Sequence, residues 1–418
     1  MNPGRRRFLV PEVVQTSNMD CGPATLKALL EGFGIRANYG RLREACQTDV
    51  DGTSIDTIEE VANQLGLEAE QIMLPRDHVF LEASRALPAV AVIVQPNGNT
   101  HFVVVWSRHG RFVQLMDPAV GRRWVPAARF LDDLYIHKMP VPAADWREYA
   151  GSPDFQDPLR ERLDRLGFAN SSADFIADAN SDYDWKSLAA LDAAARLLES
   201  LVDSGAIPRG PETARLLESF LEHDATIAEP YWSVQPTADE DKLLLRGAVL
   251  IRIVGRKATP GTPSSPELVA ALGQRPARPG RELLHMLAAD GLLTPSALAA
   301  ALALASGAVI IEAILFRGLL GLGTSLIEPR QRFGAIAAIA IFSFALLLVE
   351  IPVIGALLRV GRRLEVRLRL AFLRKIPRLP DRYFQSRLKS DMAERSHSIH
   401  LIRRLPELGG QLLRYTFS

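Results

Sequence analysis

The 418-residue sequence predicts an α+β domain at its N-terminus, followed by a mainly α-helical region and an α-helical hairpin that crosses a membrane. Three observations carry this prediction. A cysteine precedes a helical pattern, and a histidine and an aspartate lie at the two ends of a β-hairpin pattern further along. Amphipathic helical stripes fill the middle of the chain, and two long apolar stretches lie in its last third.

A helix is predicted directly after Cys21. Pro23 suits the first turn of this helix, and Gly34 suits its C-terminal end. The helix would carry apolar residues at the spacing i, i+3, i+4 and i+7, namely Leu26, Leu29, Leu30 and Phe33. Cys21 then lies at a helix N-terminus, where the helix dipole and a nearby imidazolium favour the nucleophilic thiolate.

A β-hairpin is predicted between His101 and Asp117. Residues 102–106 form an apolar, β-branched run, 108–110 supply a turn, and 112–116 lead back. If the register is symmetric about His109, His101 faces Asp117 directly, with Cβ atoms roughly 5 Å apart. The carboxylate could then orient the imidazole and stabilise its protonated form.

Gln15 lies one short loop before Cys21, where its side-chain amide could point at a developing oxyanion. Taken singly, each of these residues has a plainer interpretation. A lone cysteine is more often a small buried apolar residue, and a lone histidine at a strand end is more often a surface residue. Together, Gln15, Cys21, His101 and Asp117 have the composition of a thiol-protease site.

At these positions the sequence resembles the papain-like C39 peptidases, which form the N-terminal domain of bacteriocin-processing ABC exporters. The resemblance covers about residues 8 to 140. It implies that Cys21, His101 and Asp117 form a catalytic triad and that Gln15 helps build the oxyanion hole. The matching stretches are Gln15 with Asp20-Cys21-Gly22, Gly52-Thr53-Ser54 before a helix ending at Leu65-Gly66-Leu67, His101-Phe102-Val103-Val104, and Asp117-Pro118-Ala119-Val120-Gly121.

The composition bounds the partners and the compartment. With 49 basic and 48 acidic residues, the charge balance gives no argument for a nucleic-acid partner. Only two cysteines are present, and a disulfide between Cys21 and Cys46 would destroy the nucleophile. We therefore expect a reducing, cytoplasmic setting for the peptidase domain, which we assign to residues 1–143.

The middle of the chain offers no chemistry that the sequence identifies. Helical stripes such as the one from Leu188 to Leu201 indicate a small helical domain, assigned to residues 144–255. Within it, residues 243–254 are apolar and partly β-branched, and periodicity leaves strand and helix both open. Residues 256–290 contain several prolines and are predicted to form a linker.

Two apolar stretches, about residues 292–318 and 333–358, are each long enough to cross a hydrocarbon core of about 30 Å. The alternative, helices buried in a soluble core, fits two such long neighbouring stretches poorly. Arginines cluster after the second stretch, so both ends of this hairpin should face the cytoplasm. We expect a multi-pass protein of the cell membrane, in contact with the lipid bilayer.

Residues 291–418 resemble the start of an ABC-exporter transmembrane domain, with residues 359–418 as its cytoplasmic extension. The sequence contains no G-x-x-x-x-G-K-[ST] phosphate loop, so no cofactor is expected on this chain and ATP is expected only on a separate nucleotide-binding domain. No metal site is predicted. We expect a dimer, or a partner chain that carries the ATPase domain.

The resemblance implies a cysteine endopeptidase that cleaves ribosomally made precursor peptides after a double-glycine-type leader, coupled to ABC-type export. Cys21 would attack the carbonyl carbon, His101 would transfer the proton, Asp117 would hold His101, and Gln15 would stabilise the oxyanion. Two alternatives remain open from the sequence. The chain could be a non-cleaving leader-binding or transport subunit completed by an ATPase-bearing chain, or an inert fragment of an interrupted exporter gene.

Overall fold

The computed structural model describes residues 6–223, 226–239, 241–257, 265–274, 279–288, 329–379, 381–385 and 387–417, together with single residues between 307 and 318. The chain divides into two compact units, Met1–Pro276 and Ala277–Ser418. The candidate site lies entirely in the first unit.

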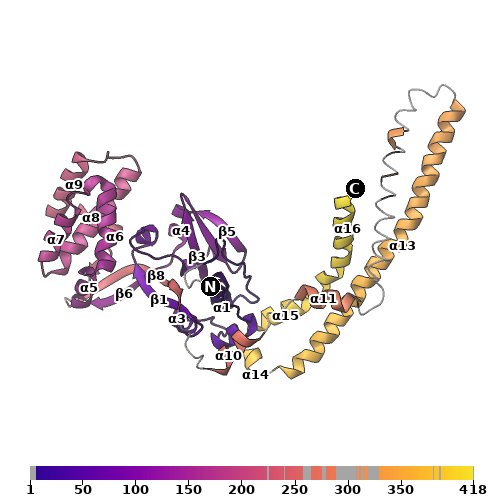
Figure 1. The fold of residues 1–418 in the computed structure, drawn as a ribbon, viewed down its shortest axis with the longest axis horizontal. Helices are drawn as coiled ribbons and strands as arrows, with labels where there is room; N and C mark the ends of the chain where they lie inside the picture. Colours follow the sequence, from indigo (N-terminus) through magenta and orange to yellow (C-terminus); the bar gives the residue numbers. More distant parts are fainter. Residues whose placement is uncertain are drawn as a thin grey trace. The chain divides into compact units, whose positions relative to one another are not determined.

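Within the described residues, eight strands form one antiparallel sheet, whose main path runs in the order β1-β8-β2-β3-β4-β5. Figure 1 shows this sheet in the first unit, with β1, β3, β5, β6 and β8 labelled. β6 and β7 also pair with β8. The last strand along the chain therefore lies between the first two. The strands are β1 (Leu67–Leu74), β2 (Ala89–Val94), β3 (Thr100–His109), β4 (Phe112–Asp117), β5 (Gly121–Pro126), β6 (Ile136–Pro142), β7 (Val234–Pro236) and β8 (Lys242–Arg256).

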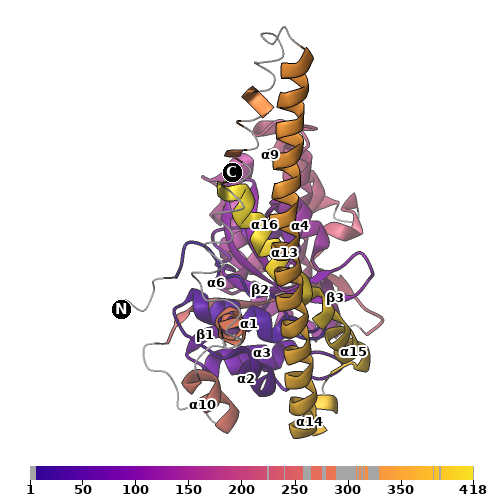
Figure 2. The same ribbon diagram turned by 90° about the vertical axis from the view of Figure 1, so that its right-hand side faces the viewer.

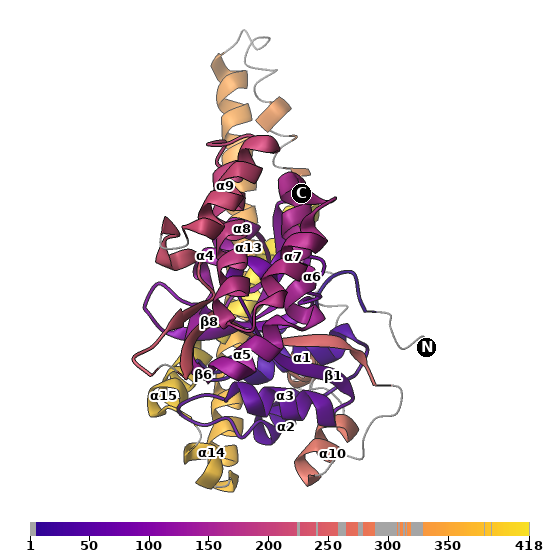
Figure 3. The ribbon, with the colours of Figure 1, turned by 90° about the vertical axis from the view of Figure 1, so that its left-hand side faces the viewer.

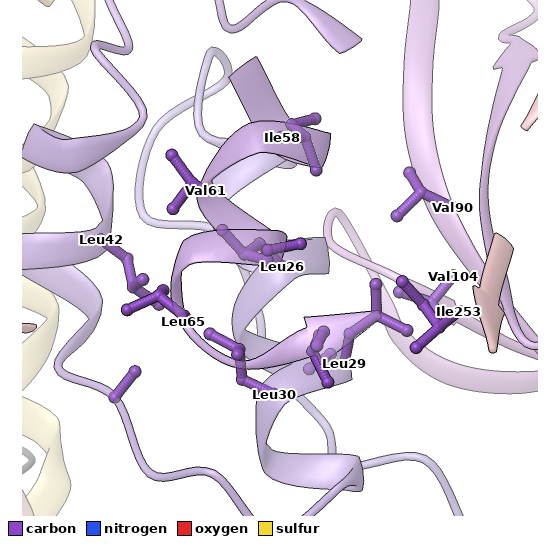
Figure 4. Packing of buried hydrophobic residues seen from close by; sticks show 14 of the residues in the cluster. Leu26, Leu29, Leu30, Leu42, Ile58, Val61, Leu65, Val90, Val104 and Ile253 are labelled. Carbon is purple, nitrogen blue, oxygen red and sulfur yellow. The ribbon is translucent and has the colours of Figure 1, made fainter. Parts of the chain in front are cut away.

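Three helices cover one face of this sheet: α1 (Cys21–Gly32), α2 (Tyr39–Ala45) and α3 (Ile55–Gln64). The predicted apolar stripe of α1 is buried. It packs against Val90, Val104 and Ile253 of three neighbouring strands (Figure 4). Gly32 lets the end of α1 approach the sheet, since a Cβ atom there would collide with the Trp106 ring. This packing fixes the direction of α1, and hence the place of its first residue.

A second apolar cluster covers the opposite face. Phe80 of the short helix η1 (Arg76–Phe80) and Phe130 of α4 (Ala127–Asp133) pack there with Val103, Leu115 and Leu250 of the sheet. Both faces of the central strands are thus buried, which explains their nearly continuous apolar sequences. Beside these helices, α10 (Pro266–Gly273) contacts α2, and the Asn38 backbone N–H donates to the Ala271 carbonyl.

A helical module connects β6 to β7 and β8 (Figure 3). Pro142 at the end of β6 and Lys242 at the start of β8 are cross-strand partners. The module therefore leaves and re-enters the sheet at adjacent positions. Its elements are α5 (Ala143–Ala150), α6 (Pro153–Leu163), the π-helical turn η2 (Asp164–Phe168), α7 (Ser172–Ser181), α8 (Trp185–Asp203), α9 (Pro211–Glu222) and η4 (Glu229–Tyr231).

Charged side chains attach the module to η1, and those on the module, Arg162, Asp192 and Arg196, are at most 9% exposed. Asp77 lies 2.7 Å from Arg162 and 2.9 Å from Arg196, measured from its Oδ2. His78 Nε2 lies 3.4 Å from Asp192 Oδ1. Burial alone would raise the pKa of Asp77, but the two guanidinium groups outweigh it and lower that pKa. The carboxylate of Asp77 is thus held in its charged form at the junction.

Several predictions can be compared directly with these elements. The α+β fold predicted for the N-terminal domain is observed, with α1 beginning at Cys21. The open question about residues 243–254 is resolved in favour of a strand, because they lie inside β8. That strand falls within residues 144–255, the range predicted to form a helical middle domain. In the structure the helices of this range end at Tyr231, and the chain then returns to the sheet. The predicted linker, residues 256–290, contains α10 and α11 (Pro279–Ala288).

The described residues of the second unit are mainly helical. Its long helix α13 (Pro329–Lys375) is continuous (Figure 2). Within this unit Val360 and Leu364 are buried, and the Gly361 backbone approaches Arg403 so closely that a Cβ atom would collide with the Arg403 carbonyl. The remaining elements are η5 (Ile376–Arg378), α14 (Asp381–Gln385), α15 (Lys389–Ser398), η6 (Ile399–Arg404) and α16 (Leu405–Phe417).

The predicted membrane hairpin requires a correction. Most of the first predicted span, residues 292–318, lies outside the described residues. The second, residues 333–358, lies inside α13, which continues past residue 358 through the arginine-rich segment to Lys375. In the part of the chain that the structure describes, no helix combines the length and the apolar composition needed to cross a bilayer. The hairpin prediction is therefore not supported there.

Candidate active site

Cys21 is the first residue of α1, and its side chain is partly exposed. The first N–H groups of a helix have no acceptor within the helix and carry the positive end of its dipole. Pro23 lies in the first turn, as predicted, and Gly34 adopts a left-handed φ of 80° just beyond the last turn. The local sequence thus places a thiol at an electropositive, accessible helix end.

His101 lies near the start of β3, and Asp117 is the last residue of β4. Because the two strands are antiparallel, both residues lie at the same end of the sheet. His101 Nε2 is 2.9 Å from Asp117 Oδ1, and both side chains are only 5% exposed. The structure therefore brings the predicted base and its predicted orienting residue together.

The predicted register of this hairpin is wrong in detail. His109 pairs with Phe112, so the turn lies at Gly110 and Arg111, and an irregularity between Val105 and Ser107 shifts the ladder again. Continuing from the Val104–Met116 pair would place Asp117 beside Val103, two residues from His101. The contact is therefore diagonal. Strand side chains repeat every two residues, so this shift keeps both side chains on one face.

The surroundings of His101 raise the pKa of its imidazole. Its burial lowers its pKa, but hydrogen bonds to Asp117 and Cys21, together with the charges of both partners, outweigh burial and raise the pKa of His101 to about 9. Asp117 engages Nε2, which leaves Nδ1 as the nitrogen that can exchange a proton with the thiol. The imidazole can therefore act on Cys21 while its orientation is fixed from the other side.

Asp117 has further partners. Its Oδ1 accepts the Ala119 backbone N–H at 2.9 Å, and its Oδ2 lies 2.8 Å from Nη2 of Arg123 on β5. Burial would raise the pKa of Asp117, but the bonds to His101 and Ala119 and the charges nearby lower it. Arg123 was not among the residues predicted from the sequence. Nothing in the sequence of β5 distinguishes Arg123 from a solvent-exposed strand residue, so this contact could not be predicted.

Gln15 lies in the extended segment before α1, and its backbone N–H donates to the Pro118 carbonyl at 2.8 Å. This bond ties Gln15 to the loop directly after Asp117. The Gln15 side-chain oxygen is buried and has no hydrogen-bond partner among the described residues. No hydrogen bond to this oxygen from the described residues therefore fixes the orientation of the Gln15 side-chain amide.

The segment that carries Gln15 is anchored along the sheet. The Val10 N–H donates to the Gln114 side chain at 2.7 Å, and Arg122 donates to the Val10 carbonyl at 3.0 Å. Gly121, with a φ of 103°, leaves room for Glu12, because a Cβ atom there would collide with the Glu12 carboxylate. These contacts hold the segment beside β4 and β5.

The second cysteine lies in a different environment. Cys46 is the C-cap residue of α2, and its side chain is 1% exposed. Burial raises the pKa of the Cys46 thiol to about 12, so it stays protonated and poorly nucleophilic at neutral pH. The contrast with Cys21 separates a packing cysteine from the candidate nucleophile.

The part of the chain that carries this site is similar to proteins of known families. The model of the peptidase C39 family matches residues 10–135. The chain is 33% identical over 155 residues to the lactococcin-G-processing and transport ATP-binding protein LagD of Lactococcus lactis, which covers 37% of this chain and 20% of that protein. It is 28% identical over 135 residues to the transport/processing ATP-binding protein ComA of Streptococcus pneumoniae. The chain thus spans about a fifth of the length of these two relatives.

A shorter relative aligns over most of its own length. An uncharacterized protein of Methanothermobacter marburgensis is 30% identical over 124 residues, which are 28% of this chain and 79% of that protein. Among solved structures, a double glycine motif protease from an AMS/PCAT transporter, in complex with its leader peptide, matches with a TM-score of 0.27 and 23% identity. That match covers 32% of this chain and 90% of the other. The peptidase domain of Streptococcus ComA matches with a TM-score of 0.28 and 24% identity, over 30% and 92% of the two chains.

Proposed function

This chain belongs to the peptidase C39 family through residues 10–135, and on that premise we propose that it is a cysteine endopeptidase that cleaves precursor peptides after a double-glycine-type leader. The single observation that best supports the proposal is the 2.9 Å contact between His101 and Asp117. Interaction with Cys21 adds to the rise in the pKa of the same imidazole. A nucleophile, a base and a group that orients the base are the minimum set for this chemistry.

The reaction would begin with the thiolate of Cys21 and the imidazolium of His101. The sulfur attacks the carbonyl carbon of the scissile bond, and the carbonyl π electrons move to oxygen to give a tetrahedral oxyanion. The Gln15 side-chain amide and the Cys21 backbone N–H would stabilise that oxyanion. As the C–N bond breaks, His101 gives its proton to the leaving amine, and an acyl-enzyme remains.

Water would then complete the cycle. His101, now neutral, takes a proton from a water molecule that attacks the thioester carbonyl carbon. The second tetrahedral intermediate collapses, releases the leader as a carboxylic acid, and restores the thiolate and the imidazolium. Asp117 holds His101 in one orientation and tautomer throughout both steps.

The proposal extends to partners. The relatives LagD and ComA are described as processing and transport ATP-binding proteins, which supports a link between leader cleavage and ATP-driven export. We propose that an ATP-binding domain on a partner chain supplies the export step, and that the substrate of this chain is the precursor peptide itself.

Leader cleavage by the full chain tests the proposal. A synthetic precursor with a Gly-Gly site is incubated with the wild type and with Cys21→Ala, and the products are identified by mass spectrometry. We expect a single cut after the second glycine by the wild type and none by Cys21→Ala, because removal of the nucleophile removes covalent catalysis. Cys46→Ala is the matched control and should still cleave. Equal cleavage by Cys21→Ala would contradict the assignment.

A further inference from the structure

Asp20, the residue directly before the proposed nucleophile, carries a fully buried carboxylate that takes no part in the steps above. Its Oδ1 lies 2.6 Å from Arg43 Nε. Its Oδ2 accepts the Thr16 hydroxyl at 2.9 Å and the Tyr39 hydroxyl at 3.4 Å. Three side chains from two segments of the chain therefore converge on one carboxylate.

The location of Asp20 makes these contacts informative. It is the N-cap residue of α1, a position at which an aspartate usually accepts a backbone N–H of the first turn. Here the side chain makes no such capping bond. Its bonds run instead to Thr16, four residues back in the loop, and to Tyr39 and Arg43 of α2. The carboxylate joins the loop to α2 rather than capping α1.

Tyr39 forms hydrogen bonds to both Thr16 and Asp20. Its hydroxyl accepts the Thr16 backbone N–H at 3.2 Å while it donates to Asp20. Thr16 is thus held through both its backbone and its hydroxyl. Gln15, the proposed oxyanion donor, is the residue immediately before Thr16, and Cys21 is the residue immediately after Asp20.

We propose that Asp20, with Tyr39 and Arg43, is a positioning device that fixes the loop between Gln15 and Cys21 so that the Gln15 amide and the Cys21 N–H point at the same oxyanion. This inference rests on the proposed function. It makes Asp20 a positioning residue, since its carboxylate contacts other side chains and not the reacting atoms. Oxyanion stabilisation depends on donors placed within a few tenths of an ångström, so loss of the device reduces turnover more than substrate binding.

The device is separable from the thiolate–imidazolium pair. Asp20 contacts Thr16, Tyr39 and Arg43, whereas His101 is held by Asp117 at the end of the sheet. Alkylation of Cys21 by a small reagent needs the thiolate but no oxyanion hole. Variants of the device should therefore lower the turnover number while leaving the alkylation rate unchanged, which a general loss of structure would not do.

Two variants of the full chain test the device. Tyr39→Phe keeps the ring and removes only the hydroxyl that links Thr16 to Asp20. Asp20→Asn combined with Arg43→Gln removes both charges together, so no unpaired buried charge is left to unfold the domain. Glu31→Gln is the matched control, because it also converts a carboxylate to an amide on α1 and breaks an ion pair, with Lys27. Cleavage of a fluorogenic Gly-Gly peptide amide gives kcat and KM, and iodoacetamide gives the alkylation rate.

We expect kcat to fall roughly tenfold for Tyr39→Phe and roughly 100-fold for the double variant, approaching the loss of one oxyanion donor. KM and the alkylation rate should change less than about threefold, and Glu31→Gln should match the wild type. In a Gln15→Ala background, Tyr39→Phe should reduce kcat by less than the tenfold expected in the wild type, since one of the two donors that the device positions is already absent.

Unchanged kcat in both variants would overturn this inference while leaving the proposed function intact. A parallel fall in the alkylation rate would also overturn it, because the variants would then act on the thiolate. Full additivity of Tyr39→Phe and Gln15→Ala would show that Tyr39 does not act through Gln15. Absence of cleavage by the wild type would overturn the proposed function and this inference with it.

Discussion

Arg123 Nη2 lies 2.8 Å from Asp117 Oδ2, on the carboxylate oxygen that His101 does not use. Asp117 therefore joins an exposed strand of the sheet to the proposed base. The two contacts differ in burial, because Arg123 is 42% exposed whereas His101 is 5% exposed. An exposed ion pair of this kind contributes little free energy, whereas the buried contact sets the orientation of the imidazole.

Asp117→Asn should leave the fold intact and reduce kcat by up to about 10⁴-fold, because an amide favours the wrong imidazole tautomer. Arg123→Gln should reduce kcat only a few-fold, since the exposed guanidinium does not touch His101. Circular dichroism establishes that both variants are folded, and leader cleavage gives the two rates. An unfolded Asp117→Asn variant would instead indicate a structural role for this carboxylate.

Cleavage should depend on pH through His101. Its pKa is raised from the ordinary 6.5 to about 9, so the imidazolium is present at neutral pH and is lost as the pH rises through about 9. We expect kcat/KM to fall on the alkaline side with a midpoint near pH 9. For the same reason, the stabilisation of the folded state by this contact is complete below pH 6.5 and declines between pH 6.5 and 9.

The Asp117→Asn variant provides the control for this pH dependence. Two of the interactions that raise the pKa of His101 come from Asp117, so the alkaline midpoint should move to lower pH when the carboxylate becomes an amide. The comparison requires a measurable residual rate, or the pH dependence of Cys21 alkylation in its place. An alkaline limb that does not move would exclude His101 as its origin.

Gln15→Ala should reduce kcat roughly 100-fold with little change in KM, as expected for one oxyanion donor. The backbone bond from Gln15 to Pro118 does not depend on the side chain, so the loop should keep its path. Steady-state kinetics on the Gly-Gly peptide separate the two parameters. A rise in KM at constant kcat would make Gln15 a substrate-binding residue.

The sequence predicted the local parts of the site well, because each depends on short-range patterns. The α1 stripe and its ends follow from helical periodicity and from the conformational preferences of Pro23 and Gly34. The contact between His101 and Asp117 was predicted from hairpin length, although the turn and the ladder irregularity moved the register by two residues. An even shift preserves the face, so the contact was found for a partly mistaken reason.

The parts that could not be predicted are long-range. Arg43 lies 23 residues from Asp20, and no periodicity links them. β8 follows a helical module of about a hundred residues and then enters the sheet between β1 and β2, and sequence patterns do not specify which distant strands pair. Its apolar sequence fits both a helix and a strand because it is buried on both faces.

The position of β8 predicts where the peptidase unit can be cut. Among the described strands, β1 pairs only with β8, and β2 lies on the other side of β8. A chain that ends after Ala150 lacks β8 and leaves β1 without a partner, so it should aggregate or remain unfolded. A chain that ends after Pro276 contains the whole first unit and should fold and cleave. Thermal unfolding and leader cleavage distinguish the two.

A third variant separates the strand from the module that precedes it. Pro142 and Lys242 are cross-strand partners, so an Asn-Gly turn can replace residues 143–241 and join β6 directly to β8. This variant keeps the strands that pair with β1 and β2. It also exposes η1 to solvent, so that water hydrates the Asp77 carboxylate in place of Arg162. We expect it to fold and to cleave leader peptide. If it fails while the chain ending after Pro276 succeeds, the module itself is required; if the chain ending after Ala150 cleaves, β8 is dispensable and this account of the sheet is wrong.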